Sequence, residues 1–535
     1  MRIIATYFGH ESTIVTYNDG DIKIYELDRL SGEKFLRLMD KTAVMWMEVI
    51  SEVLELEGNP EYDLWINGTS APGKGASDGY VWSSRLRNTI RYKRHILGPA
   101  SHHLCHAWCA FGQMPVDKGF IISFDGGGSD GVFHMFRSNK KNGIEHMAAR
   151  DRYDWGSTYH LAGVVAPEVG NTTNHVLASA GKSMALAALW KGDRKNNARF
   201  KLLRADFYKV YSGEFKHMRK IYRDLGLPHD ARNRNFKSNR EFVTIEDENL
   251  GRMICAANQE VFEARLLDVI TDLSYEIMSR HDGNLILTGG CALNVVANER
   301  VKNRIGCNIF VPPNPSDSGI ALGQLFYYLN LVGLPLPHKP LHFNGAPLVK
   351  DYPRPKKRKA TIKSIAKLIK EGNVLAIVEG DAEVGPRALG KRSIVCDPSI
   401  EGMKDKLNSQ VKKREHYRPF APVMLEDQAK TYCKTSTFTN MEYMSYACEM
   451  NESFVEQFPA VTHVDGSARV QIIYDEEMTL YKLVKEIGTP LLNTSCNIQG
   501  QPIIARESEA FAMFDQGIDA LVLNGVLYKK PIVDK

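Results

Sequence analysis

Short apolar runs that end in glycine recur along the chain and alternate with segments of helical periodicity. Residues 119–128 (GFIISFDGGG) and 283–290 (GNLILTGG) each read as a buried strand with a glycine turn, and the second leads into the helix opening CALNVVANE. A long helix over 254–277 is predicted between them, because apolar residues recur there at helical spacing: Val261, Leu267, Ile270, Leu273 and Ile277. Such strand, turn and helix units predict an α/β fold.

Two stretches interrupt this pattern. Residues 137–250 are polar with mixed acidic and basic segments, and we interpret them as an insertion that contains helices. Residues 333–359 hold six prolines and little periodicity, which predicts an extended connector. Helical spacing in TIKSIAKLIKEGN and a buried strand at VLAIVEG resume the pattern beyond it. The predicted boundaries are therefore a first domain over 1–335, a Pro-rich and basic linker over 336–358, and a second domain over 359–535.

Composition is that of an ordinary globular protein. The 535 residues are 43% hydrophobic and 24% charged, and the net charge of +5 suits anionic small ligands at least as readily as nucleic acid. The nine basic residues between Lys350 and Lys370 are interpreted as a solvated linker and helix face, with a nucleic-acid patch as the alternative. Nine cysteines without short paired spacings, no secretory signal and no apolar run of about 18 residues predict a reduced, cytoplasmic protein without a membrane span.

Histidines and aspartates with metal-binding chemistry lie in the first half of the chain. If SHHLCHAWCAF is helical, His102 and His106 share one helix face, the spacing by which two imidazoles bind one cation, and His103 is a further candidate. That pair alone is more often structural than ligating. Asp125 ends a strand ahead of three glycines, and Asp317 opens a helix, where an N-cap is its alternative role. Mixed His and Asp ligands favour Fe, Mn or Zn.

Glycine turns beside these acids predict a bound nucleotide, because their backbone N–H groups can approach phosphates closely. The turns are DGGGSDG and TGGCALN, with Gly126, Gly127, Gly128, Gly289, Gly290 and Asn294 as the candidate contacts. ASAGKSMALAALW resembles a P-loop but has Val176 where the pattern needs glycine, so we reject that reading. His10 in FGHES follows a strand and is either a base near neutral pH or a turn residue.

In the second half, cations gather in turns stiffened by glycine and proline. The first is EVGPRALGKRS, and KKREHYRPFAP, DGSARVQ and LLNTSCNIQGQP follow it. Because guanidinium groups bind phosphate oxygens in pairs, several of them in such segments predict a phosphate pocket. The residues assigned to this pocket are Arg387, Arg392, Lys412, Arg414, Arg418, Arg469, Asn493, Ser495 and Asn497. The sequence leaves open which of Lys412, Lys413, Arg414 and Arg418 point inward.

Nine motifs in order resemble the O-carbamoyltransferase family, whose members modify antibiotics and nodulation factors and include tobramycin carbamoyltransferase. The motifs are FGHES, HHLCHAWCAF, SFDGGGSDG, AGKSMALAA, LTGGCALN, NPSDSGIALG, VGPRALGKRS, KKREHYRPFAP and LLNTSCNIQGQP. The resemblance spans residue 3 to about residue 530 and is weakest over 137–250. It implies an actin-like (ASKHA-type), duplicated α/β domain for 1–335 and a YrdC-like, twisted α/β domain for 359–535.

The resemblance also implies the reaction. The C-terminal domain would form carbamoyl adenylate and pyrophosphate from carbamoyl phosphate and ATP, the latter with Mg²⁺. The N-terminal domain would transfer the carbamoyl group to an acceptor hydroxyl and release AMP. By resemblance, His102, His106, Asp125 and Asp317 hold iron, with manganese or zinc as alternatives, and His10 is the general base.

Two residues depart from the family pattern. Glu11 stands where the family usually has Asp, and Cys496 where it often has Phe. Both changes are mild and put fine geometry rather than activity in question.

The expected partners are a small-molecule hydroxyl acceptor, carbamoyl phosphate and ATP, without membrane or nucleic acid, and a homodimer is compatible with the sequence. Sugars, antibiotics and nucleosides or nucleotides stay open as acceptors. Two other functions stay open as alternatives: transfer of a threonylcarbamoyl group to tRNA, and a nucleotide-binding scaffold without turnover.

Overall fold

The computed structural model describes residues 1–68, 86, 89–128, 130–150, 152–173, 175–227, 242–353, 359–435 and 437–530. Part of the predicted insertion (228–241) and the last five residues of the predicted linker (354–358) lie outside these ranges, and with them four of the nine basic residues between Lys350 and Lys370.

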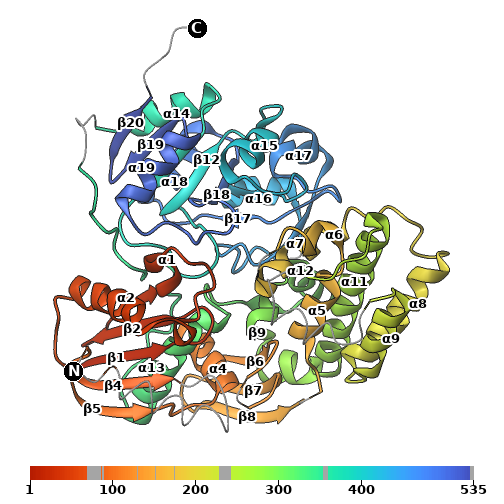
Figure 1. The fold of residues 1–535 in the computed structure, drawn as a ribbon, viewed down its shortest axis with the longest axis horizontal. Helices are drawn as coiled ribbons and strands as arrows, with labels where there is room; N and C mark the ends of the chain where they lie inside the picture. Colours follow the sequence, from red (N-terminus) through yellow and green to blue (C-terminus); the bar gives the residue numbers. More distant parts are fainter. Residues whose placement is uncertain are drawn as a thin grey trace.

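The first half of the chain builds two five-stranded sheets of the same topology (Figure 1). In each sheet, the first three strands in the chain pair antiparallel with one another. A fourth strand then pairs parallel with the free side of the first strand, and a fifth pairs parallel with the fourth. The first sheet has the order β3 (Asp21–Glu26), β2 (Thr13–Asn18), β1 (Arg2–Tyr7), β4 (Tyr62–Gly68) and β5 (Tyr92–Leu97). The second has β8 (Gly143–Ala149), β7 (Phe133–Asn139), β6 (Lys118–Phe124), β9 (Asn284–Thr288) and β10 (Asn308–Phe310). This repetition confirms the predicted α/β fold and its internal duplication.

The helices repeat as well. α2 (Ala43–Leu56) precedes β4 as α11 (Glu248–Asp272) precedes β9, and α4 (His102–Gln113) follows β5 as α13 (Ile320–Leu331) follows β10. Between β9 and β10 lies α12 (Val295–Ile305). α4 packs against α13, and each of the two lies on the sheet of the other repeat: α4 on β6, β7 and β9, and α13 on β1, β2 and β4. The two equivalent helices therefore form a shared layer between the repeats.

The predicted long helix is confirmed as α11, whose buried side includes Val261 and Ile270, although Ile277 belongs to a separate π-helix (Glu276–Arg280). The predicted strands at 119–124 and 284–288 are β6 and β9. A short helix, α1 (Leu27–Ser31), follows β3.

A helical segment is inserted between β8 and α11. It contains α5 (Trp155–Gly163), α6 (Pro167–Gly170), α7 (Ser179–Ala187), α8 (Ala198–Tyr211) and α9 (Lys216–Asp224). The sequence placed the start of this insertion at residue 137, but residues 137–149 complete β7 and form β8. They looked like part of the insertion because β8 is an edge strand without a buried residue, which permits a polar sequence. The segment ASAGKSMAL is helical as α7, consistent with its rejection as a P-loop.

The C-terminal part contains a mixed seven-stranded sheet and a small three-stranded one. The large sheet has the order β17 (Gln471–Ile472), β13 (Ala421–Met424), β18 (Leu491–Ser495), β12 (Arg392–Cys396), β11 (Leu375–Val378), β19 (Ala520–Leu523) and β20 (Val526–Lys529). The small sheet consists of β14 (Cys433–Lys434), β15 (Cys448–Met450) and β16 (Ser467–Ala468). The helices are α14 (Ile362–Lys370), α15 (Met403–Lys406), α16 (Glu426–Tyr432), α17 (Glu452–Gln457), α18 (Thr479–Ile487) and α19 (Glu507–Gln516). The helix and strand predicted after the linker are α14, with a capping box at Thr361, and β11.

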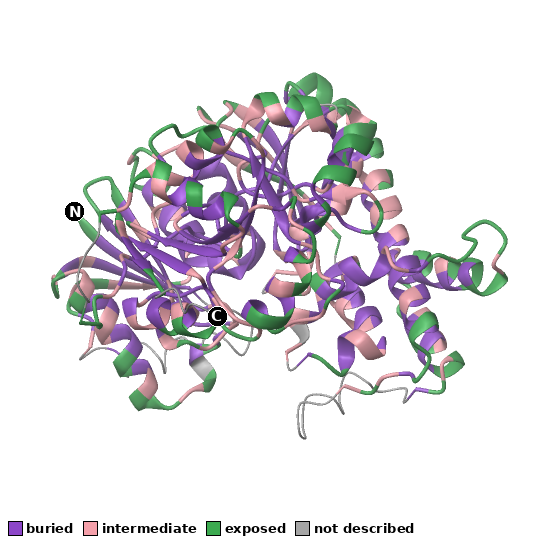
Figure 2. Cartoon of the chain, turned by 90° about the horizontal axis from the view of Figure 1, so that it is seen from above, coloured by how far each residue is buried: buried purple, intermediate pink, exposed green. Residues whose placement is uncertain are grey.

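The connector is bonded to both parts of the chain. Ile24 N–H of β3 donates to Asn344 O at 2.8 Å, and Gly345 N–H donates to Ala382 O at 3.0 Å. Buried residues of the second sheet, α11 and the C-terminal sheet share one hydrophobic cluster, and the purple strands in Figure 2 show this burial. The connector is thus packed between the N-terminal sheets and the C-terminal part rather than extended into solvent.

All nine cysteines of the chain are buried and none forms a disulfide. No helix in the described part of the chain is long and apolar enough to cross a membrane.

Candidate functional site

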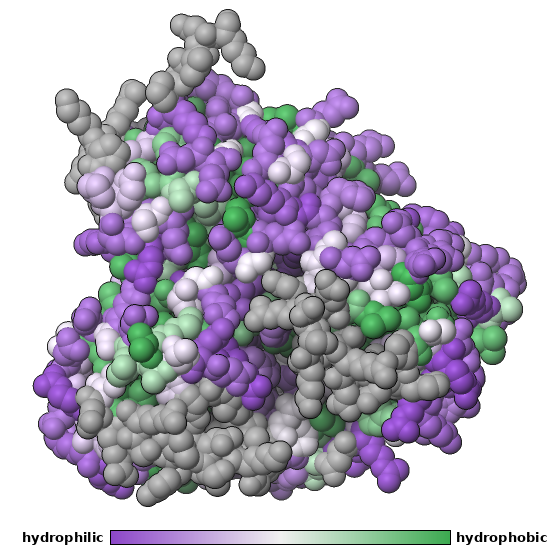
Figure 3. Space-filling model, in the orientation of Figure 1, coloured by the Kyte–Doolittle hydropathy of each residue, from purple (hydrophilic) through white to green (hydrophobic). Residues whose placement is uncertain are grey.

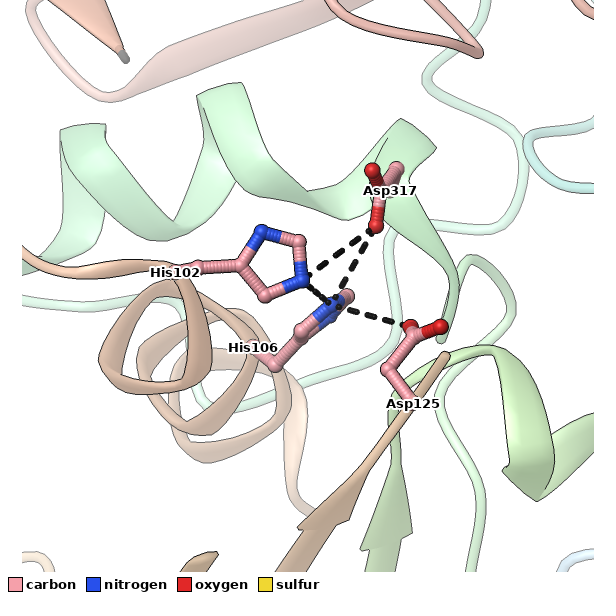
Figure 4. A group of neighbouring side chains, drawn as sticks. All are labelled: His102, His106, Asp125 and Asp317. Atoms are coloured by element: carbon pink, nitrogen blue, oxygen red, sulfur yellow. Dashed lines mark hydrogen bonds and ion pairs between the residues drawn. The ribbon is translucent and has the colours of Figure 1, made fainter. Parts of the chain in front are cut away.

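Two histidines and two aspartates from distant parts of the chain converge on one point (Figure 4). His102 and His106 lie in the first two turns of α4 with their Nε2 atoms 3.1 Å apart. Asp125 follows β6, and its Oδ2 is 3.4 Å from His106 Nε2. Asp317 precedes α13, and its Oδ1 is 3.5 Å from both Nε2 atoms. One ligand atom from each residue lies within 4.8 Å of the others, which is the predicted quartet.

The electrostatics of the quartet suit a cation. Burial disfavours charge on His106, but its contacts with Asp125 and Asp317 outweigh this and raise the pKa of His106 to about 9. Burial likewise opposes ionisation of Asp125, yet the His106 hydrogen bond lowers the pKa of Asp125 to about 2. The aspartates are therefore ionised at neutral pH. Two imidazole nitrogens and two carboxylates form a donor set that fits a divalent transition ion.

Neighbouring groups hold the two carboxylates in place. Tyr7 OH donates to Asp317 Oδ2 at 2.6 Å, and His10 Nε2 lies 3.1 Å from the same oxygen. Both oxygens of Asp125 accept backbone hydrogen bonds, from Gly126 N–H and Gly290 N–H, at 2.6 Å each. Asp317 is not the N-cap that was its alternative role, because Ser316 occupies that position and the aspartate side chain faces the histidines.

Sequence reasoning missed Tyr7. The sequence feature that could have identified it is a tyrosine at the last position of a buried strand, directly before the FGHES motif. The hydroxyl orients the Asp317 carboxylate, and hydrogen bonds of this kind commonly support the ligands of metal sites.

The internal repeat explains how the quartet is assembled. β1 and β6 are equivalent strands, and Tyr7 and His10 lie at the end of one as Asp125 lies at the end of the other. α4 and α13 are equivalent helices, and members of the quartet lie at the N-terminal end of the first and in the turn directly before the second. The site therefore lies where the two repeats meet. His10 has 44% of its side chain exposed against 3% for Asp317, so the histidine stands on the open side.

The predicted glycine turns line this site closely. A Cβ atom at Gly128 would lie 2.6 Å from the ring of His102. Gly289 has a φ of +89°, and a Cβ there would lie 2.2 Å from Phe124 O. Gly127 has open space where a side chain would be, and Gly126 and Gly290 bond to Asp125. The glycines thus permit a close approach of backbone to the aspartate and histidine side chains.

Asn294, predicted as a nucleotide contact, has partners within the protein. It caps α12 by accepting from Ala297 N–H at 3.1 Å, and its amide pairs with Gln259. It therefore supports the helix that follows the glycine turn.

Four arginines form a second cluster, in the C-terminal part. Burial and nearby Arg418 lower the pKa of Arg387 to about 10. The pKa of Arg469 is lowered strongly, first by burial and then by the positive charges of Arg387, Arg414 and Arg418. The buried Nε of Arg469 has no hydrogen-bond partner among the described residues. Cations that depress one another in this way indicate a pocket for an anion.

The other predicted pocket residues shape this region. Lys412 is buried and donates to the carbonyl oxygens of Ser495 and Asn497 at 2.7 and 2.8 Å. Asn493 donates to Ala388 O at 3.0 Å. Lys413, at a positive φ of 49°, is exposed, whereas the guanidinium of Arg414 lies over the Phe420 ring at 4.4 Å. Lys412, Ser495 and Asn497 therefore form an internally bonded wall.

Arg392 differs from its predicted place in the pocket. It is fully buried at the start of β12, and its guanidinium donates to the carbonyl oxygens of Glu379, Gly380 and Lys391 at 2.8 to 3.0 Å. Its two Nη groups are therefore occupied by backbone, and we correct its role to a structural one.

The first repeat also reaches the pocket, which the sequence did not suggest. Arg29 of α1 donates to Glu383 O at 2.6 Å and to Gly385 O at 2.7 Å, just before Arg387 in the chain. Burial, Arg418 and Arg387 lower the pKa of Lys34 to about 8, so this lysine faces the same cations. Isolated charges such as Arg29 and Lys34 carried no local signal in the sequence.

Arg387 also lines a small cavity between the two parts of the chain. Its other walls include Leu293, Pro315 and Met444. Leu293 belongs to the segment after the second glycine turn and Pro315 to the segment before Asp317, so Arg387 packs against segments that neighbour the quartet in sequence.

Family models match most of the chain. The carbamoyltransferase N-terminus model matches residues 56–325, and the carbamoyltransferase C-terminus model matches residues 366–530. The chain is 30% identical over 461 residues to nodulation protein NolNO of Sinorhizobium fredii, a match that covers 80% of this chain and 63% of that relative. It is 28% identical to nodulation protein NolO of Bradyrhizobium diazoefficiens, covering 80% of this chain and 79% of the relative.

Similarity to solved structures is lower. The HypF structure from T. kodakarensis aligns with a TM-score of 0.33 and 14% identity, covering 62% of this chain and 48% of that chain. The archaeal actin homologue Ta0583 aligns with a TM-score of 0.28 and 12% identity, covering 62% of this chain and all of that chain. The two family models, in order and on both sides of the connector, carry the assignment: this chain belongs to the carbamoyltransferase family.

Proposed function

We propose that this protein is an ATP-dependent O-carbamoyltransferase with two reaction sites. Carbamoyl phosphate, ATP and water react in the arginine pocket to give carbamoyl adenylate, pyrophosphate and inorganic phosphate, and the carbamoyl group then passes to a hydroxyl of an acceptor beside the quartet. The observation that supports this best is the pair of sites itself. One concentrates uncompensated guanidinium groups, and the other joins a histidine base to a metal-binding donor set.

In the activation step, the anionic substrates occupy the space among Arg387, Arg418 and Arg469. Water first hydrolyses carbamoyl phosphate to carbamate and inorganic phosphate. The carbamate oxygen then attacks the α-phosphate of ATP, which binds with Mg²⁺, and pyrophosphate leaves. Guanidinium groups stabilise the charge that develops on the phosphate oxygens in both steps. Arg29 holds the backbone on which Arg387 stands, and Lys34 adds a cation from the first repeat.

In the transfer step, His10 takes the proton of the acceptor hydroxyl while its Nε2 stays 3.1 Å from Asp317. His102, His106, Asp125 and Asp317 would hold a divalent ion, for which we propose iron, with manganese or zinc as alternatives. Such an ion supplies positive charge for the phosphate of the departing AMP. The backbone amides of Gly127 and Gly128 would bind the same phosphate, whereas those of Gly126 and Gly290 hold Asp125 in place.

Two substitutions separate the steps. Arg387→Ala should reduce pyrophosphate release from carbamoyl phosphate and ATP by about 100-fold or more, because it removes a cation from the reacting phosphates. His10→Ala should leave pyrophosphate release intact and lower carbamoyl transfer by about 100-fold. Pyrophosphate is measured by a coupled assay, and transfer by mass spectrometry over a panel of hydroxyl acceptors.

Lys367→Ala, an exposed cation of α14, is the matched control and should change neither step. Unchanged pyrophosphate release in Arg387→Ala would exclude the arginine pocket as the activation site. Full transfer by His10→Ala would exclude that histidine as the base.

A further inference from the structure

The charge of the chain is concentrated in one segment of the insertion. Residues 191–227 contain eleven Lys and Arg but four Asp and Glu, a net charge of +7. The whole chain has a net charge of +5, so the remaining 498 residues carry −2. The modest overall charge therefore conceals a strongly basic element.

This element is a helical hairpin at one end of the molecule. Figure 1 places α8 and α9 at the far right of the longest axis, and Figure 3 shows strongly hydrophilic residues along that end. Nine of its eleven cations are exposed, and on α9 three of them recur at i, i+3 and i+7: Lys216, Arg219 and Arg223. α8 is 14 residues long, about 21 Å, so the charge forms an extended surface.

Most of this charge is not neutralised within the protein. Six cations of the segment have no acidic partner within ion-pair distance in the described ranges: Lys191, Lys195, Arg199, Lys201, Lys209 and Arg219. Such like charges repel one another and attract an extended anion.

The hairpin lacks the features of two other kinds of binding surface. The apolar side of α9, with Met218, Ile221 and Tyr222, is buried, so it is not available for insertion into a membrane. The exposed large apolar residues of this segment are Leu202, Tyr208 and Phe215, and no two of them are consecutive or three or four residues apart, so they do not form an apolar centre of the kind that protein interfaces bury. A phosphodiester backbone needs neither feature, only cations spread along its length.

The hairpin is also coupled to the quartet through one helix. Trp155 of α5 donates to Tyr211 O at the end of α8 at 2.9 Å, and Tyr222 of α9 donates to Leu161 O of α5 at 2.9 Å. At the other side of α5, Ser157 donates to Gly126 O at 2.9 Å, next to Asp125. A polymer held on the hairpin is therefore held by an element that contacts the transfer site.

We propose that the α8–α9 hairpin binds the phosphodiester backbone of a nucleic acid. This goes beyond the carbamoyl chemistry proposed above, and it replaces the sequence-based expectation that nucleic acid is not a partner.

The test measures binding of a fluorescent 30-base-pair DNA duplex, and of an RNA duplex of the same sequence, by anisotropy across a salt series. The variant carries Lys195→Glu, Arg199→Glu, Lys209→Glu and Arg219→Glu, all at exposed positions. The matched control carries four reversals at exposed lysines of the C-terminal part: Lys363→Glu, Lys367→Glu, Lys370→Glu and Lys485→Glu. Circular dichroism and pyrophosphate release verify that both variants fold and activate carbamoyl phosphate.

The wild type should bind duplex with a log–log salt slope of about −0.9 for each phosphate contacted, and the hairpin variant should bind at least about 100-fold more weakly with a shallower slope. The control should bind like the wild type. Equal binding by the hairpin variant and the wild type would overturn the proposal. So would polyglutamate or phosphatidylserine vesicles binding the hairpin as tightly as duplex does.

If the wild type releases pyrophosphate but does not bind duplex, this inference is refuted and the proposed function is not. Absence of pyrophosphate release in the wild type would refute the proposed function and leave the binding result to stand by itself.

Discussion

Arg387 and Arg392 stand five residues apart, and their guanidinium groups have opposite surroundings. Arg392 donates to three backbone carbonyls inside the C-terminal part, whereas Arg387 lines a cavity and no hydrogen bond to it is formed among the described residues. Removing the Arg392 side chain leaves buried carbonyl oxygens without their hydrogen-bond donors. Removing the Arg387 side chain takes away a buried positive charge that Arg418 repels.

We therefore expect Arg392→Met to lower the free energy of unfolding by about 3 kcal/mol, because buried acceptors lose their donors. Arg387→Ala should change the free energy of unfolding by less than about 1 kcal/mol. Urea unfolding of both variants measures the difference. A stable Arg392→Met protein with a raised KM for carbamoyl phosphate would instead return Arg392 to the pocket.

At this scale the sequence singled out the members of the quartet, because each lies in a recognisable local pattern: a helical i, i+4 histidine pair, a strand end before glycines, and a helix start. Each pattern was weak alone, and the resemblance to the family joined the four residues into one site. It could not separate Arg387 from Arg392, because the start of β12 that buries the second is set by pairing with strands distant in sequence. Tyr7 was missed for a related reason, since its partner Asp317 is 310 residues away.

At the scale of elements, α7 ties the insertion to the C-terminal part. Lys182 Nζ lies 2.6 Å from a Glu415 oxygen, and both side chains are more than nine-tenths buried. Glu415 also accepts from Gln499 at 3.1 Å and lies 3.8 Å from Arg418. The ion pair thus braces the loop that carries a pocket arginine.

Lys182→Met should lower the free energy of unfolding by about 3 to 5 kcal/mol, because Glu415 is left charged and buried without its partner. Adding Glu415→Gln should recover much of that loss. A double-mutant cycle from urea unfolding gives the coupling energy.

The exposed pair Lys430–Glu426, also 2.6 Å apart, is the control and should show a coupling of less than about 1 kcal/mol. A coupling at the buried pair no larger than this would mean that the contact does not brace the loop.

The sequence rejected a P-loop at ASAGKSMAL but offered no role for its lysine, since the partner lies 233 residues further on. It predicted the existence of α11, β6, β9 and α14 because their periodicity is long or bounded by glycine. It misplaced β8, where an edge strand is polar and resembles a loop.

At the scale of the whole molecule, three elements from both repeats must come together to form the quartet: α4, the end of β6 and the turn before α13. A divalent ion bound there bridges them in the folded state only, so it should stabilise the protein.

At a free concentration of 100 times its Kd, the ion should add about 2.7 kcal/mol to the free energy of unfolding. Thermal unfolding with Fe²⁺, Mn²⁺, Zn²⁺ and Mg²⁺ under anaerobic conditions measures this and ranks the ions. Asp125→Asn should abolish the shift, whereas Asp117→Asn, at a 93% exposed side chain, should leave it unchanged. An equal shift in Asp125→Asn would place the ion elsewhere.

The resemblance to the family, rather than periodicity, predicted the duplicated architecture. The contacts that assemble the whole could not be read from local pattern. The connector bonds to β3 and to the 382–384 loop, and the Arg29 hydrogen bonds cross more than 350 residues of sequence.

The repeated topology also divides the chemistry of the quartet between the two repeats. The first repeat supplies both imidazoles, from His102 and His106, and the second supplies both carboxylates, from Asp125 and Asp317. Neither repeat carries the complete donor set by itself, so the site exists only where the two repeats are packed together.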